Sequence, residues 1–109
     1  MERSDLTSHT VTQGDHVTLH ISGDLDLTTT STFVSAAMEA LQGTPERLTI
    51  DASGLRFCDS SGLSGFVQVW KAAERSGSSV HVTHPRPQLA RVMEMTALAR
   101  MFLTDPAER

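Results

Sequence analysis

A short apolar strand, a turn and an amphipathic helix follow one another between Leu48 and Gly77, and this stretch constrains the fold more than any other part of the chain. Its turn is the tetrapeptide Asp59-Ser60-Ser61-Gly62. Asp and Ser side chains accept hydrogen bonds from the free N–H groups of a first helical turn. The sequence therefore predicts a helix that begins at about Ser60 and ends at Gly77, which suits a left-handed C-terminal cap.

The predicted helix has one apolar face. Residues at the i, i+3, i+4 and i+7 spacing of a buried stripe are Leu63, Phe66, Val67, Trp70 and Ala73. Trp70 is interpreted as a core residue, while Val69 and Ala72 widen the face towards a contact surface. The start of the helix places the Ser60 hydroxyl, the small Gly62 and free N–H groups at the positive end of the helix dipole, which favours a phosphate.

Before this stretch, Gly14-Asp15 is a two-residue turn signal between residues 10–13 and 16–22. Val17, Leu19 and Ile21 alternate with polar residues, which predicts an antiparallel hairpin with one buried face. Gly23-Asp24-Leu25-Asp26 ends the second strand. A helix follows and stops at Gly43-Thr44-Pro45; its apolar residues are Phe33, Val34, Ala37, Met38 and Leu41.

The remaining elements complete an α/β order. Leu48 to Asp51 is predicted to be a short central strand covered on both faces, Val80 to Thr83 a further strand, and residues 101–103 a last short strand. Pro85 to Pro87 opens a third helix. The order β-β-α-β-α-β-α-β predicts one α/β domain over residues 1–109, with its core at 5–104 and helices packed against a mixed sheet of about five strands.

Composition narrows the classes of function. The chain has 109 residues, 39% apolar and 20% charged, as in soluble globular proteins. Its N-terminus is polar, and no apolar run approaches the roughly 20 residues that span a bilayer, so we expect a cytoplasmic protein with no membrane partner. The net charge of -4, without a basic stripe, argues against nucleic acid and favours a protein partner. Cys58 is interpreted as a small core residue.

Catalytic and metal sites are disfavoured by spacing. Gly62-Leu63-Ser64-Gly65 lacks the Gly-x-Ser-x-Gly spacing of a nucleophile elbow, which argues against a serine hydrolase. His81 and His84 are expected to face opposite sides of a strand, and His16 and His20 lie about 13 Å apart by strand rise. No metal site is therefore expected. No Walker sequence is present either.

Considered without any known family, the polar residues Asp24, Asp26 and Ser60 are each explained by a role in a turn or a helix cap. Asp24 and Asp26 are typical turn residues, because an Asp side chain can bond to the backbone nearby. Ser60 is interpreted as a helix cap worth about 1 kcal/mol.

A family resemblance adds to this interpretation. Gly23-Asp24-Leu25-Asp26 before a Thr-rich helix start, Phe57-Cys58-Asp59-Ser60-Ser61-Gly62-Leu63 between strand and helix, and the late Met95-Thr96-Ala97-Leu98 resemble the STAS domain of bacterial anti-sigma factor antagonists. The similarity covers nearly all of residues 5–104. The Asp-Ser-Ser-Gly-Leu sequence is its most specific part.

The resemblance implies a partner-regulated switch. Ser60, in preference to Ser61, corresponds to the serine that a partner kinase phosphorylates. That partner is an anti-sigma factor with a histidine-kinase-like ATP-binding fold; the unmodified antagonist binds it and releases the sigma factor, phosphorylation ends the binding, and a PP2C-type phosphatase restores it. The kinase supplies ATP and metal, so this chain needs no cofactor and is not an enzyme. The implied partner-binding residues are Asp24, Asp26, Asp59, Ser60, Ser61, Gly62, Leu63 and Ser64.

The chain departs from the family pattern at three places. Ser64 replaces a common glycine and makes the first helical turn bulkier, and Ala97 replaces another, at a cost of about 1 kcal/mol if that position needs positive φ. The chain ends soon after Leu103, where many relatives continue with another helix, so the last helix is either short or missing. If it is missing and normally covers the sheet, an apolar patch is left open that favours dimers; a monomer or weak dimer is expected. The alternative is a STAS scaffold in a sensory complex, or an accessory subunit of a lipid transporter, with no sigma-factor role.

Overall fold

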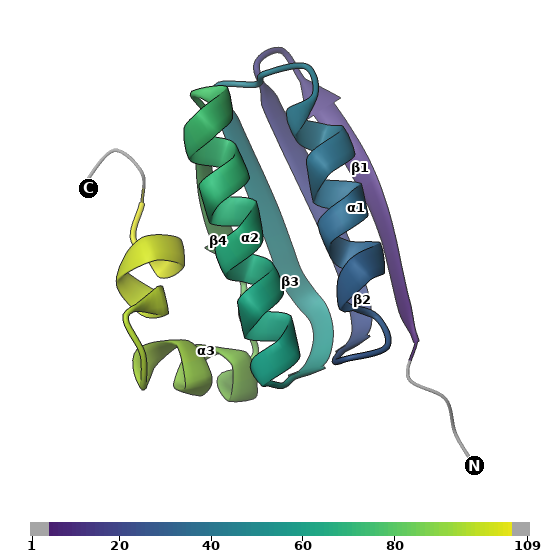
Figure 1. The fold of residues 1–109 in the computed structure, drawn as a ribbon, viewed down its shortest axis with the longest axis vertical. Coiled ribbons are helices and arrows are strands. Elements are labelled where there is room, and N and C mark those ends of the chain that lie inside the picture. The colour runs from purple at the N-terminus through teal and green to yellow at the C-terminus, as the bar shows by residue number, and fades with distance from the viewer. Residues whose placement is uncertain (1–4, 106–109) are drawn as a thin grey trace.

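A sheet of four strands carries two long helices on one face (Figure 1). The structure is a computed structural model that describes residues 5–105. Its elements are β1 (Leu6–Gln13), β2 (His16–Leu25), α1 (Thr30–Leu41), β3 (Arg47–Cys58), α2 (Ser60–Ser76), β4 (Ser79–Thr83), α3 (Pro87–Glu94) and the π-helical turn η1 (Ala99–Leu103). None of the helices within residues 5–105 is long and apolar enough to cross a membrane.

The strands lie in the order β1-β2-β3-β4. The predicted hairpin is confirmed: β1 and β2 are antiparallel across a turn in which Gly14 has a φ of 59°. β2 and β3 are parallel, as are β3 and β4. The carboxyl ends of these three strands therefore meet at one end of the sheet, which is also where α2 begins.

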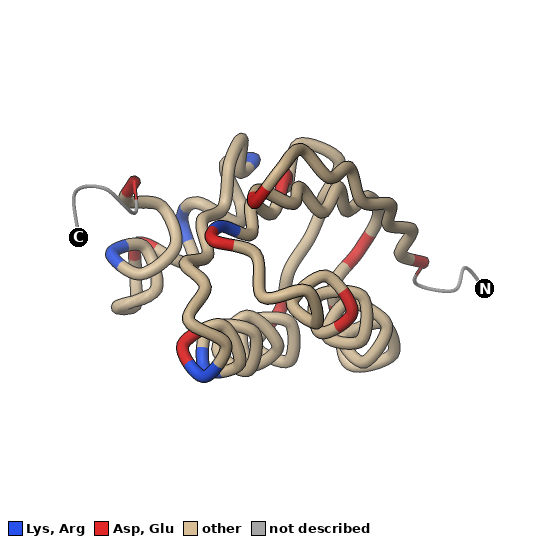
Figure 2. Tube along the Cα trace, turned by 90° about the horizontal axis from the view of Figure 1, so that it is seen from above, with Lys and Arg blue, Asp and Glu red and all other residues tan. Residues whose placement is uncertain are grey.

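β3 occupies the central position that the sequence predicted, but it is covered on one face only. It has twelve residues, and the buried Leu48, Ile50 and Ala52 alternate with less buried neighbours. The reason is visible in Figure 2, where α1 and α2 lie together on one side of the sheet. The prediction of a short strand covered on both faces is wrong, because Thr49 and Asp51 face the side without helices.

α2 confirms the predicted helix at both ends, while its most buried stripe is displaced. Gly62, Gly65, Phe66, Val69, Ala72 and Ala73 are buried. Leu63, Val67 and Trp70 are partly buried and pack against the core. Val69 and Ala72 therefore belong to the core and not to a contact surface. The buried stripe is displaced because α2 packs against α1 as well as against the sheet. The contact with α1 is close at Gly65, where a Cβ would lie 2.8 Å from Thr30 Cγ2.

The predicted last strand is a helical turn, so the sheet has four strands and not five. η1 carries Phe102, which is fully buried and packs edge-on against Phe66 and Trp70, with 5.4 Å between ring centroids in each pair. This turn covers the core residues where an open apolar patch was expected. Ala97 is not among the described non-glycine residues with positive φ, so it carries no such strain.

The face of the sheet opposite the helices is polar and holds histidines from several strands. The rings of His9 and His20 stack at 4.6 Å, and His20 Nδ1 lies 2.8 Å from Asp51 Oδ2. Burial would raise the pKa of Asp51, but hydrogen bonds from Ser53 and His20 hold it below its usual value.

His84 follows β4 with a φ of 55°, and its Nδ1 lies 3.7 Å from Asp51 Oδ1. Since Thr49 pairs with His81, and paired residues share a face, His81 and His84 lie on the same side. The prediction that they point to opposite faces is wrong because the strand has ended before His84. Within residues 5–105, no three His, Cys, Asp or Glu side chains are grouped to hold a metal ion.

Candidate functional site

The candidate site is centred on the first turn of α2, and Asp59 caps that turn. Asp59 has extended backbone geometry, and its Oδ1 accepts a 3.0 Å hydrogen bond from the Gly62 N–H. The Leu63 N–H bonds to the Asp59 carbonyl oxygen at 3.0 Å. Asp59 satisfies part of the helix terminus itself, so Ser60 is not the N-cap residue.

Ser60 is exposed, as is Ser64 one turn later, whereas Ser61 and Leu63 are partly buried. The Ser60 hydroxyl is therefore accessible at the positive end of a 17-residue helix. Among the two serines of the predicted pair, Ser60 is the more exposed.

Gly62 lies beneath this turn and is buried. A Cβ at this position would lie 2.7 Å from Cys58 Sγ and 2.8 Å from Leu25 Cγ. Gly62 thus allows α2 to start close to the ends of β2 and β3, and it supports the exposed serines without being exposed itself.

The end of β2 lies beside this turn. In the parallel register, Asp24 pairs with Phe57 and Leu25 with Cys58, and the Asp59 N–H donates a 3.1 Å bond to the Leu25 carbonyl. Asp24 and Asp26 are therefore brought to the same end of the sheet as Ser60. All predicted site residues come from this one region.

The two carboxylates from β2 have different neighbours. Asp24 Oδ2 lies 3.4 Å from Arg56 Nη2, and the Arg56 side chain is 61% exposed. Asp26 Oδ1 accepts bonds from the N–H and the hydroxyl of Thr28 at 3.0 and 2.8 Å. The interpretation of Asp26 as a turn residue is confirmed, while Asp24 is an ion-pair partner.

Four residues of this region were not identified from the sequence. Gln88 on α3 holds both backbone groups of Cys58: its Oε1 accepts from the Cys58 N–H at 3.0 Å, and its Nε2 donates to the Cys58 carbonyl at 2.9 Å. Arg56 was missed because the register was unknown. Leu27 and Phe57 are exposed apolar side chains, 80% and 44% exposed. Leu27 is the second residue after β2 and Phe57 is the second-last residue of β3, and these strand-end positions were the available signal.

Cys58 lies under the site as a core residue, which confirms the prediction. It is 1% exposed, and burial, with a smaller contribution from the Asp59 charge, raises the pKa of its thiol to about 12. The thiol is therefore protonated and unreactive at neutral pH.

Comparison with known proteins identifies the family. The family model described as "Mlab, STAS domain" matches residues 8–104. The chain belongs to the STAS domain family. The α/β fold of this chain and the Asp-Ser-Ser-Gly sequence at the start of α2 therefore belong to a STAS domain, as the resemblance implied.

Solved STAS structures share this fold at low identity. An anti-sigma factor antagonist from Mycobacterium paratuberculosis superimposes with a TM-score of 0.77 at 20% identity, over 95% of this chain and 90% of that one. A STAS domain protein from Planctomyces limnophilus gives 0.74 at 18%, over 93% and 92%. The Bacillus cell fate determinant SpoIIAA in its phosphorylated form gives 0.69 at 18%, over 94% and 95%. At these identities the likeness establishes the STAS fold.

Proposed function

We propose that this STAS domain is an anti-sigma factor antagonist whose binding is switched off by phosphorylation of Ser60. Its unmodified form binds an anti-sigma factor with a histidine-kinase-like ATP-binding fold and releases the sigma factor, and a PP2C-type phosphatase resets it. The observation that carries the proposal is the exposed Ser60 hydroxyl on a turn capped by Asp59. Solved structures with the same fold include anti-sigma factor antagonists, among them SpoIIAA, whose structure is also known in a phosphorylated form.

The surface around Ser60 has the mixture of groups that a protein partner recognises. Exposed Leu27 and Phe57 lie at the same end of the sheet as Ser60, as do the acidic residues Asp24 and Asp26. Apolar and aromatic side chains supply most of the energy of protein contacts. Ser60, Ser64 and these two apolar residues therefore form the proposed contact surface, and Gly62 shapes it from below.

Phosphorylation acts on the complex through charge. A phosphate adds about -1.5 to -2 charges at pH 7, next to Asp59 in sequence and at the strand end that carries Asp24. One like-charge pair at about 4 Å costs roughly 4 kcal/mol at an effective dielectric near 20. Since about 1.4 kcal/mol is tenfold in affinity, one such repulsion in an interface weakens binding roughly a thousandfold.

The same phosphate is tolerated by the isolated domain. Ser60 is exposed, so the phosphate stays in water, and the helix dipole stabilises a negative charge there by about 0.3–1 kcal/mol. The modification therefore changes binding while the fold persists.

Phosphopeptide mapping tests the switch directly. The protein is isolated from its own cells, with and without phosphatase treatment, and the peptide that contains Ser60 and Ser61 is sequenced by mass spectrometry. Phosphate at Ser60 supports the proposal. Its absence under several growth conditions favours the alternative, a STAS scaffold or accessory subunit without a sigma-factor role.

Variants at Ser60 separate binding from folding. We expect Ser60→Asp to keep the wild-type melting temperature and to lose binding to the anti-sigma factor, because it places a permanent negative charge in the interface, and Ser60→Ala to bind constitutively. Gln68→Glu, at an exposed position about two turns further along α2 and outside the proposed contact surface, is the matched control for an added charge and should bind like the wild type. The measurement is titration calorimetry with the purified kinase-type anti-sigma factor. Wild-type affinity in Ser60→Asp contradicts the proposal.

A further inference from the structure

Strand β1 forms one edge of the sheet, and within residues 5–105 no strand pairs with its outer side. β1 has eight residues, and each pairs with β2 in an unbroken register from Leu6–Gly23 to Gln13–His16. The opposite edge, β4, has five residues and lies against η1. The two edges thus differ: one is short and covered, and the other is long and regular.

β1 lacks the features by which edge strands usually avoid pairing. Charged side chains, proline and bulges are the common protections. The β1 sequence contains none of Lys, Arg, Asp, Glu or Pro, its pairing has no bulge, and seven of its eight residues are exposed. Thr7, Thr10, Val11 and Thr12 are β-branched and favour a strand. An exposed edge of this composition is suited to accept another strand.

The outward backbone groups can be assigned. The Asp24 N–H bonds to the Asp5 carbonyl at 2.8 Å, so Asp5 and Asp24 form a hydrogen-bonded antiparallel pair. Because such pairs alternate along the strand, odd-numbered residues bond to β2, and the N–H and C=O groups of Ser8, Thr10 and Thr12 point outward.

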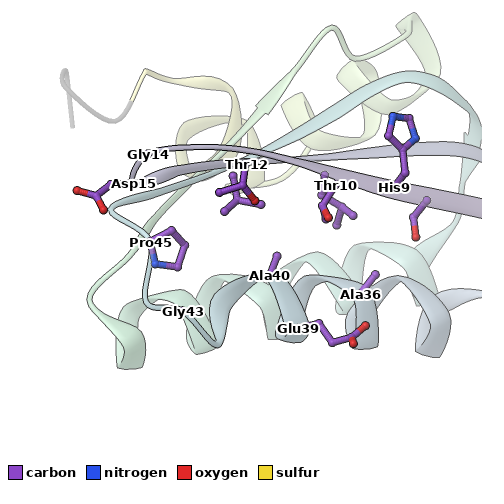
Figure 3. A pocket seen from close by; sticks show the side chains of 13 residues that line it. His9, Thr10, Thr12, Gly14, Asp15, Ala36, Glu39, Ala40, Gly43 and Pro45 are labelled. Atoms are coloured by element: carbon purple, nitrogen blue, oxygen red, sulfur yellow. The ribbon is translucent and has the colours of Figure 1, made fainter.

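The side chains of these same residues face the helices. Figure 3 shows Thr10 and Thr12 directed towards Ala36 and Ala40 of α1, while His9 points to the other side of the sheet. The two threonines and the two alanines line a groove of about 500 Å³ between β1 and α1. Space is therefore open on the helix side of this edge.

We propose that β1 pairs antiparallel with β1 of a second copy of this chain, and so forms a two-fold dimer with one continuous sheet. A two-fold axis places Ser8, Thr10 and Thr12 opposite residues of the same even-numbered set. Opposed residues share a face of the sheet, so the helices of both copies lie on the same side. An uncharged strand meets its copy without like-charge pairs, and the contact closes after two chains.

The charges near this edge have both signs. Asp15 and Glu39 line the groove between β1 and α1. Arg56 and Arg86 line a separate hollow together with Asp5 and Thr7. Charges of a single sign therefore do not oppose the pairing of two copies.

Sedimentation velocity from micromolar to millimolar concentration tests the proposal with three proteins. Wild type and Thr10→Val keep the outward N–H and form a dimer. Thr10→Pro removes that N–H, which β2 does not use, and stays monomeric with an unchanged circular dichroism spectrum. A wild type that is monomeric throughout, or a Thr10→Pro protein that still forms the dimer, overturns the proposal.

Amide hydrogen exchange on the wild type gives a second test without a variant. The amides of Ser8, Thr10 and Thr12 exchange more slowly as protein concentration rises, whereas those of His9 and Val11 are protected at every concentration. Equal, concentration-independent exchange of the first three amides in the dimer contradicts β1 pairing. Neither test involves Ser60, so the result is independent of the proposed antagonist function.

Discussion

At the scale of single residues, three neighbouring residues at the start of α2 have different roles. Asp59 caps the helix, Ser60 is exposed, and Gly62 is buried against Cys58 and Leu25. Because the Asp59 carboxylate caps the helix, the Ser60 side chain is not needed as a cap. A modification of the hydroxyl therefore need not unfold the helix.

Gly62→Ala tests how closely this turn is packed. The new methyl group meets Cys58 Sγ and Leu25 Cγ at less than 3.0 Å. We expect the free energy of unfolding to fall by about 1–3 kcal/mol, although Ala favours a helix over Gly by about 1 kcal/mol.

Urea denaturation measures the change. Gly43→Ala is the matched control, because a Cβ at Gly43 meets nothing within 4 Å. A Gly62→Ala protein as stable as the control contradicts this account of Gly62.

At the scale of elements, α3 fixes the end of β3 to the site. Gln88 lies on α3 and bonds both the N–H and the C=O of Cys58, the residue directly before Asp59. β4 is too short to pair with this part of β3, since its register ends at Asp51–Thr83. A side chain from the next helix replaces the missing strand.

Gln88→Ala is expected to loosen the strand end below the site. It leaves the Cys58 N–H without its partner, which costs about 1–3 kcal/mol of folding free energy. The direct measurement is the exchange rate of the Cys58 amide, which should rise. Gln68→Ala, at an exposed position on α2, should leave that rate unchanged. Equal Cys58 exchange in both variants contradicts a clamping role for α3.

At the scale of the whole molecule, η1 completes the core. Phe102 is fully buried between elements that come much earlier in the chain, against Phe66 and Trp70 of α2, and Phe66 in turn packs against Phe33 of α1. This row of aromatic rings joins α1, α2 and η1. The end of the described chain is therefore part of the fold and not an appendage.

Phe102→Ala is expected to lower the free energy of unfolding by about 3–5 kcal/mol, because it removes a fully buried ring and leaves a cavity. Chemical denaturation checks the value. Met95→Ala is the control, since Met95 is 78% exposed and its loss should change stability little. A loss below 1 kcal/mol in Phe102→Ala, roughly that of one buried methylene, would show that η1 is dispensable.

Local signals in the sequence were enough for the hairpin, for the helices α1, α2 and α3, and for the turn that carries Ser60. Gly14-Asp15 fixed the hairpin, and the Asp59 cap, the apolar spacing and Gly77 fixed α2, because turns, caps and helical periodicity depend on residues close in the chain. The Asp-Ser-Ser-Gly-Leu sequence likewise located the exposed serine before the fold was known.

Tertiary structure decided the features that depend on distant partners. Both long helices lie on one face, so β3 is covered on one side and Val69 and Ala72 are buried. Residues 101–103 became a helical turn because Phe102 packs on α2. Gln88 and Arg56 meet Cys58 and Asp24 about thirty positions away. Local sequence determined the hairpin and the three helices α1, α2 and α3, because their turns, caps and periodicity lie within short segments. Register and packing between remote segments set the form of the last element, which faces are buried and which groups gather around Ser60.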